Sequence, residues 1–124
     1  MRVFIDTNGW LRSAAWRIDL FREAQRIVPG KAEFFVVQGT KHELEGLQAA
    51  GGTLAREAKL ALLIMKDVKV IKALGATADE QLLNEAKDPD FVLTQDQDLK
   101  RRLKDKGIGV IVIRNQNHLE LENR

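Results

Sequence analysis

The sequence contains no cysteine among its 124 residues. This absence excludes disulfide bonds, zinc-thiolate sites and cysteine nucleophiles, and a reducing cytoplasm is the simplest setting for such a chain. The longest uninterrupted apolar run, residues 60–65, is far too short to span a membrane. Met1 leads almost directly into the first expected strand, so no signal peptide is expected. With no repeat, linker or low-complexity tract, residues 1–124 are predicted to form one cytoplasmic domain.

A large excess of charge of one sign is also missing. The 20 basic and 18 acidic side chains give a formal net charge of +2, which permits a nucleic-acid partner without requiring one. The chain has neither a glycine-rich phosphate loop nor a dinucleotide-binding fingerprint. The pair Gly51-Gly52 is expected to join two helices, where it would hold no phosphate.

The apolar pattern predicts five strands that alternate with helices. The expected strands are residues 3–5, 34–37, 68–71, 91–93 and 110–113, and the third shows the polar alternation of an edge strand. A polar, Arg-containing turn is expected after Asp6. Helices are then expected at residues 16–28, from Thr40 to the Gly51-Gly52 pair, at residues 53–66, from Thr77 onward and between Asp96 and Gly107. The helices at Thr40 and Thr77 begin with the spacing of a capping box, completed by Glu43 and Glu80. This alternation predicts an α/β fold, a three-layer α/β/α sandwich with a parallel sheet. The tail after Arg114 is expected to add a short edge strand or to fray.

Four acids occupy equivalent places along this pattern. Asp6 and Asp96 follow the first and fourth strands, while Glu43 and Asp79 lie at the start of the helices after the second and third. Helix capping is a sufficient explanation for each acid alone. However, all four would project from one end of the sheet, where unpaired carboxylates raise one another's pKa. A divalent cation relieves such crowding, and ligands that are all oxygen favour Mg²⁺ or Mn²⁺ over zinc.

The short motifs around these acids resemble those of PIN-domain nucleases, over nearly the whole chain. The motifs are Asp6-Thr7-Asn8, Glu43-Leu44-Glu45, Ala78-Asp79 with Leu82 and Ala86, and Thr94-x-Asp96-x-x-Leu99. The later stretch of residues 101–107, followed by a β-rich run into Arg114, resembles the archaeal and eukaryotic branch linked to small-subunit rRNA processing. It is less similar to the VapC toxins.

This resemblance implies a Mg²⁺- or Mn²⁺-dependent endoribonuclease, acting in rRNA processing or RNA turnover, with strand order 3-2-1-4-5. The family's catalytic, metal-binding acids match Asp6, Glu43, Asp79 and Asp96, and its supporting polar positions match Asn8 and Thr94. The chain departs from the branch at Gln95, where Asn is usual, and at Glu80, where a second Asp is frequent. Cleavage assisted by such ions needs no His, Ser or Lys nucleophile.

Two further expectations concern partners. RNA phosphates would be bound by cations beside the acids. The candidates are Lys100, Arg101, Arg102, Lys104, Lys106 and Arg114. The alternative is that these side chains are only solvated, as is usual for a basic run on an exposed helix. The helix at residues 53–66 is apolar on more than one side, with Leu60, Leu63 and Ile64 outside its core stripe. We therefore expect a homodimer or a higher homo-oligomer.

Three alternatives remain open from the sequence. The first is a PIN-like module that binds RNA or protein without cutting, although such a site usually loses one of its acids. The second is a receiver or phosphatase-like domain, in which an aspartate accepts phosphate beside an adjacent acid pair. The third is a VapC-type toxin ribonuclease, which would require an antitoxin partner.

Overall fold

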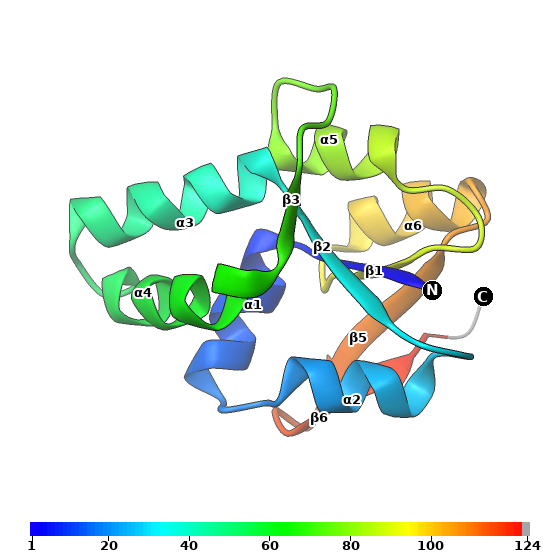
Figure 1. Ribbon diagram of the computed structural model, residues 1–124, viewed down its shortest axis with the longest axis horizontal. Coiled ribbons are helices and arrows are strands. Elements are labelled where there is room, and N and C mark those ends of the chain that lie inside the picture. The colour runs from blue at the N-terminus through cyan, green and yellow to red at the C-terminus, as the bar shows by residue number, and fades with distance from the viewer. Residues whose placement is uncertain (123–124) are drawn as a thin grey trace.

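The computed structural model describes residues 1–122, which form one sheet with helices on both of its faces (Figure 1). Five strands run parallel and follow the order β3-β2-β1-β4-β5, so the predicted order is confirmed. A sixth strand extends this sheet, which was predicted to have five. The strands are β1 (Arg2–Ile5), β2 (Glu33–Val37), β3 (Lys69–Ile71), β4 (Phe91–Leu93), β5 (Gly109–Arg114) and β6 (His118–Leu121).

The central strand β1 lies between β2 and β4 and is buried on both faces. Val3 pairs with Phe34 on one side and with Phe91 on the other. Val3 and Ile5 belong to one hydrophobic cluster, and Phe4 belongs to a second cluster on the opposite face. This alternation is the expected consequence of an apolar run in the middle of a parallel sheet.

The helices divide between these two clusters, which confirms the three-layer sandwich. One cluster contains residues of α1, α2, α3 and α4, and the other contains residues of α5 and α6. Within residues 1–122, no helix is both long enough and apolar enough to cross a membrane. The helices are α1 (Thr7–Ala15), α2 (Leu20–Ile27), α3 (Gln38–Ala50), α4 (Ala55–Ile64), α5 (Ala78–Glu85) and α6 (Gln97–Asp105), with a 3₁₀ turn, η1 (Met65–Asp67), after α4.

The first helical region differs from the prediction of one helix at residues 16–28. The chain forms α1 directly after Asp6, where a polar turn was expected, and then forms α2. Arg17 adopts a left-handed conformation with φ of 56°, which ends the first helix. The side chain of Asp19 then accepts a hydrogen bond from the Arg22 backbone and caps α2.

Gly51 and Gly52 join α3 to α4, as predicted, with φ values of 72° and 88° that favour glycine. The second of these helices begins at Ala55, two residues later than expected. Leu54 therefore lies outside α4 and is 45% exposed, whereas Ala58 and Ala61 form the buried stripe.

The polar tail forms the antiparallel edge strand β6, one of the two expected outcomes. Asn115 and Gln116 both have positive φ and turn the chain back, so that Arg114 pairs with His118. Glu122 continues this pairing, because its backbone N–H donates to the carbonyl of Val110. Residues 123 and 124 lie outside the described part of the chain.

Candidate active site

The site lies at the carboxyl ends of β1 and β4, which are neighbours in the sheet. The chain leaves these two strands toward helices on opposite faces, because α1 and α6 belong to different clusters. Open α/β sheets bind ligands at such a switch point. Asp6 directly follows β1, and Asp96 lies three residues beyond Leu93 at the end of β4.

Asp6 is the N-cap of α1, and its carboxylate accepts a hydrogen bond from the Gly9 backbone at 2.6 Å. The turn of helix around Gly9 packs tightly against the strands. A Cβ atom at Gly9 would lie 2.7 Å from Leu93 Cδ2, 2.9 Å from Ile5 Cγ2 and 3.0 Å from Asp6 Oδ1. Glycine thus allows the capped end of α1 to approach β1 and β4 closely.

The Asp6 carboxyl is only 6% exposed, and burial raises its pKa from the usual 3.8 to about 6. Hydrogen bonds from the Thr94 hydroxyl and the Gly9 backbone act in the opposite direction, and the negative charges of Asp79 and Asp96 raise the pKa further. The carboxylate therefore lies in a low-dielectric position close to two like charges.

Asp96 is likewise a helix cap: its carboxylate accepts a hydrogen bond from the Leu99 backbone at 2.7 Å, at the start of α6. The fully buried Thr94 lies between the two capping acids. Its hydroxyl accepts a hydrogen bond from the Asp96 backbone at 3.1 Å and also bonds to the Asp6 side chain. Thr94 therefore fixes the relative positions of two predicted site acids, which agrees with the supporting role that the sequence resemblance implies.

Asp79 enters the site from the first turn of α5. The cap of this helix is Thr77, whose hydroxyl accepts a hydrogen bond from the Glu80 backbone at 3.1 Å. The Glu80 carboxylate accepts from the Ala76 backbone at 2.7 Å, so this acid stabilises the loop before α5. Asp79 is thus left to face the site, where partial burial, Asp96 and Glu43 raise its pKa.

Glu43 was given a possible role in a capping box opened by Thr40, and that interpretation is wrong. The helix α3 begins at Gln38, directly after β2, and its N-cap residue Val37 makes no side-chain cap. Thr40 lies inside this helix, fully buried. The Glu43 carboxylate instead accepts a hydrogen bond from the hydroxyl of Thr7 at the start of α1.

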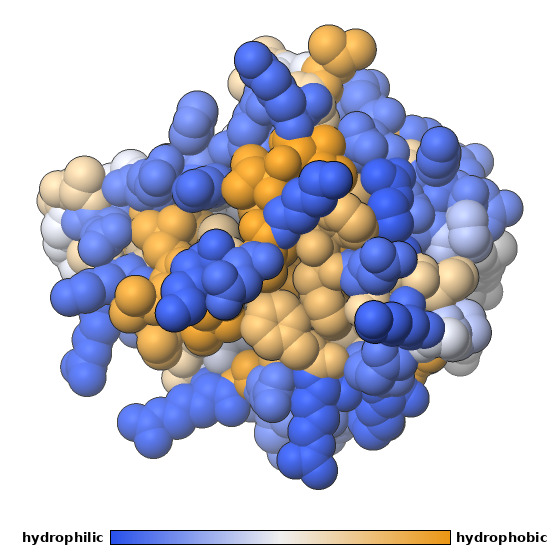
Figure 2. Space-filling model, viewed as in Figure 1, coloured by the Kyte–Doolittle hydropathy of each residue, from blue (hydrophilic) through white to orange (hydrophobic). Residues whose placement is uncertain are grey.

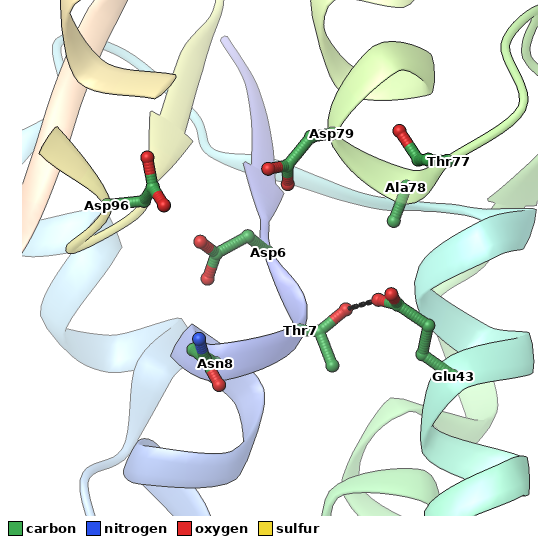
Figure 3. A pocket seen from close by; sticks show the side chains of 8 residues that line it. All are labelled: Asp6, Thr7, Asn8, Glu43, Thr77, Ala78, Asp79 and Asp96. Atoms are coloured by element: carbon green, nitrogen blue, oxygen red, sulfur yellow. Dashed lines mark hydrogen bonds between the residues drawn. The ribbon is translucent and has the colours of Figure 1, made fainter. Parts of the chain in front are cut away.

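These side chains line one cavity of about 350 Å³. In Figure 3 the carboxylates of Asp6, Asp79 and Asp96 point toward a common centre, while Glu43 turns toward Thr7 at one side. Among residues 1–122, none of these four acids forms an ion pair. The full lining is Asp6, Thr7, Asn8, Glu43, Thr77, Ala78, Asp79 and Asp96.

The acids share a cavity without forming a closed metal cage. Within the described chain, no three carboxylate or imidazole groups stand close enough together to hold one ion. Among the predicted supporting residues, Asn8 lines the cavity and Thr94 lies behind it. Two lining threonines, Thr7 and Thr77, were not predicted as site residues. Thr7 adjoins Asp6 in the first motif, which was its only signal.

The predicted RNA-binding cations differ in their exposure and in the ion pairs that they form. Lys100 is only 5% exposed, and its ammonium lies 3.1 Å from the carboxylate of Glu122, so its inclusion as a surface contact is corrected. Lys104 lies 2.9 Å from the same carboxylate, and Arg114 lies within 4.0 Å of it. Arg101 pairs with Asp98 but remains largely exposed.

Gln95, a departure from the family pattern, and Lys106, one of the predicted RNA-binding cations, both have structural roles. The Gln95 amide accepts a hydrogen bond from the Ile113 backbone at 2.9 Å and lies 3.4 Å from its carbonyl oxygen, and thereby ties the loop after β4 to β5. Lys106 donates to the carbonyls of Leu83 and Ala86 at the end of α5. Neither side chain lines the acidic cavity.

Comparison with known proteins agrees with the geometry. A family model described as a PIN like domain matches residues 3–116. The curated protein Ribonuclease VapC4 of Methanocaldococcus jannaschii is 30% identical over 125 residues, which cover 97% of this chain and 95% of that protein.

Two solved structures share the fold. The PIN domain endonuclease Utp24 has a TM-score of 0.78 and 25% identity, over 99% of this chain and 92% of that one. VapBC-1 from nontypeable Haemophilus influenzae has a TM-score of 0.59 and 13% identity, over 87% and 96% of the respective chains, and shows the fold alone. The receiver-like alternative is thereby removed. The family model spans all four acids that gather at the switch point, and the chain belongs to the PIN-domain nuclease superfamily.

Proposed function

We propose that this protein is a divalent-metal-dependent endoribonuclease. One observation carries the proposal: Asp6, Asp79 and Asp96 line a single cavity and form no ion pair among residues 1–122. Crowded carboxylates without counter-charges are costly unless a cation binds them, and such arrangements are typical of functional sites. The relatives named as a ribonuclease and an endonuclease support the reaction class.

The chemistry of the donors fits Mg²⁺ or Mn²⁺. Every candidate ligand is a carboxylate oxygen, and hard divalent cations prefer oxygen ligands. No three carboxylates of the described chain stand close enough together to hold one ion, so Asp6, Asp79 and Asp96 would have to move closer together to bind it. Glu43 would join them after releasing Thr7. When bound, such an ion would stabilise the negative charge that develops on the phosphoryl and leaving oxygens, and it would lower the pKa of a water that serves as the nucleophile.

The chain's own residues hold the site acids in position. Thr94 bonds to the Asp6 carboxylate and accepts from the Asp96 backbone N–H, so it fixes the Asp6 carboxylate relative to the backbone at Asp96. The helix caps restrict one oxygen of Asp6 and one of Asp96, so each has a second oxygen available to a ligand. Arg102 reaches far enough to lower the pKa of Asp79 in part, and we assign it to the RNA phosphates that enter the cavity.

The test is cleavage of a labelled single-stranded RNA in Mg²⁺, in Mn²⁺ and in EDTA. We expect cleavage with either ion, none in EDTA, and none with the Asp96→Asn variant in any buffer. Binding of the RNA without cleavage in all three buffers would favour the non-catalytic module. No binding and no cleavage with either ion would refute the proposal.

For the biological role we propose rRNA processing or RNA turnover, supported by the structural likeness to Utp24. A toxin ribonuclease paired with an antitoxin is the second candidate, supported by the 30% identity to VapC4. Induced expression separates the two, because a toxin arrests growth and its Asp96→Asn variant does not. Growth unaffected by the wild-type protein would exclude the toxin role.

We also propose that the protein assembles as a homodimer or higher homo-oligomer through α4. Leu60, Leu63 and Ile64 are exposed on this helix, and Val70 is exposed on the neighbouring edge strand β3. Figure 2 shows apolar side chains gathered over this face of the molecule. Contiguous exposed apolar surface of this kind is typical of protein interfaces.

A further inference from the structure

A second cavity, of about 370 Å³, adjoins the acidic one. The two cavities share Thr7, Asn8 and Glu43 as common wall residues. From this wall the second cavity continues between α1 and α3 to the residue before α4, and its remaining lining is Leu11, Gly46, Leu47 and Leu54. It is therefore a direct continuation of the candidate active site.

The chemistry of this second cavity is different from that of the first. Three leucines form most of its surface, and the sole charged residue in its lining is Glu43. A Cβ atom built on Gly46 would meet no atom within 4 Å, so the space in front of this glycine is open. The volume lies within the range of about 300–1,000 Å³ that is usual for small-molecule sites.

We propose that this second cavity is a nucleobase subsite, which receives the base of a nucleotide adjoining the phosphate in the acidic cavity. The inference rests on the proposed ribonuclease function. A base is tied to its phosphate through one ribose, so it must lie in the immediate surroundings of the acids. An uncharged ring fits the leucine surface, whereas the charge of Glu43 repels a phosphate from it. Such a base must be unpaired, so the preferred substrate is single-stranded RNA.

Asn8 lies where this base would present its edge. Its side chain is exposed, projects from the first turn of α1 beside Asp6, and lines both cavities (Figure 3). Within residues 1–122 no hydrogen bond to the Asn8 amide is formed. An amide offers both donors and an acceptor, the combination with which side chains recognise base edges. Asn8 thus becomes a residue that selects among bases.

Gly46 allows the subsite to be filled without disturbing the fold. Gly46→Leu and Gly46→Trp place a side chain in open space, and replacement of a helical glycine favours the helix. Gln48→Leu and Gln48→Trp are matched controls, because Gln48 is exposed on the same helix and lines neither cavity. Thermal melting checks that all four variants fold.

The measurement is fluorescence anisotropy of a fluorescein-labelled ten-nucleotide single-stranded RNA, with Ca²⁺ in place of Mg²⁺. We expect both Gly46 variants to bind about ten-fold more weakly than wild type, as loss of one base contact would cause, while both Gln48 variants bind normally. A series of strands with one abasic position each should contain a strand that wild type binds about ten-fold more weakly, and the Gly46 variants should not distinguish it from the intact strand.

The results that would refute the subsite can be distinguished from those that would refute the ribonuclease function. If wild type cleaves RNA with Mg²⁺ and the Gly46 variants bind and cleave as it does, the subsite is refuted and the ribonuclease stands. If wild type neither binds nor cleaves RNA, both proposals fall together. If the Gly46 variants change the mass measured by light scattering while RNA binding is unaltered, the cavity belongs to a protein interface, and the base subsite is refuted.

Discussion

Asp6 and Asp96 cap the helices that follow two neighbouring parallel strands, and both also line the acidic cavity. A capping role and a place in the cavity wall therefore coexist in the same side chains. Each carboxylate uses one oxygen for the backbone N–H of its helix, at 2.6 Å for Asp6 and 2.7 Å for Asp96. Capping is thus confirmed for Asp6 and Asp96, and a substitution that keeps the cap can test the proposed metal binding separately.

Asp6→Asn and Asp96→Asn should preserve the helix caps and weaken the binding of Mg²⁺ or Mn²⁺. Asparagine caps helices about as well as aspartate, and removal of one charge relieves repulsion, so without metal each variant should melt at the wild-type temperature or higher. Saturating Mg²⁺ should stabilise the wild type by about 3 kcal/mol at a hundred-fold excess over the Kd, but stabilise the variants little. Calorimetry with and without the ion measures this difference.

Cleavage in the same variants should fall by orders of magnitude, because the ion supplies much of the charge stabilisation in the transition state. Asp105→Asn is a suitable control, since Asp105 is exposed on α6 and lies outside the cavity. If wild type shows no metal-dependent shift and the two cavity variants cut RNA as well as it does, the acids are caps alone.

The apolar runs were sufficient to predict the five parallel strands of this sheet and the convergence of the acids at one of its edges. Residues such as Val3, Phe4 and Ile5 are buried on both faces, and a parallel sheet brings the carboxyl ends of its strands to one edge. The helix α1 was missed because Thr7, Asn8 and Arg12 were interpreted as a polar turn. Helix capping was one of the two explanations for Asp6, and an N-cap at Asp6 implies a helix that begins at Thr7.

Other features depend on tertiary contacts that no local pattern contains. The spacing of Thr40 and Glu43 fits a capping box. However, α3 begins at Gln38, directly after β2, so Thr40 lies inside the helix and cannot cap its N-terminus. The bond from Thr7 to Glu43 joins residues 36 positions apart. Lys100 is similarly neutralised by Glu122, on a different element. Charge and spacing cannot distinguish such a paired lysine from a free one.

The burial of Asp6 should make the metal-free protein less stable as the pH rises. Its pKa of about 6 in the folded protein exceeds the usual 3.8, so the folded state binds more protons between these values. The free energy of unfolding should therefore fall by about 2 kcal/mol from pH 4 to pH 7 through this group. Urea denaturation in EDTA should show this decrease in wild type and a smaller one in Asp6→Asn, where only Asp79 contributes in the same direction.

Gly9→Ala should destabilise the protein despite the better helix propensity of alanine. The added Cβ would lie within 3.0 Å of Leu93, Ile5 and Asp6, and crowding of a packed core costs about 1–3 kcal/mol. Cleavage should fall as well, because the contact with Asp6 moves a ligand. Gly46→Ala is the control: it enters open space and should be as stable as wild type or more stable. Equal melting temperatures for wild type and Gly9→Ala would contradict this packing argument.

Arg101, Arg102 and Lys104 should account for part of the salt dependence of RNA binding. Each lost phosphate contact should reduce the slope of log K against log salt by about 0.7 for a single strand. The triple alanine variant should therefore lose about two units, with similar weakening for RNAs of different sequence. Arg22→Ala with Lys31→Ala, exposed cations outside the acidic cavity, should leave the slope unchanged. An unaltered slope in the triple variant would make α6 a merely solvated surface.

Exposed leucines on α4 lead to the last prediction, which concerns assembly. Leu63 is 57% exposed, and Leu60 and Ile64 flank it on the same helix. Burial of these side chains against a second copy removes apolar surface from water, at about 25 cal/mol per Å². Light scattering at tens of micromolar should therefore give at least twice the chain mass of 14.0 kDa.

Leu63→Lys should return the mass to that of one chain, because a lysine in the interface would bury an unpaired charge. Lys59→Leu, which changes an exposed residue of α4 in the opposite sense, should not. A single-chain mass for the wild type would show that α4 makes no such interface at this concentration.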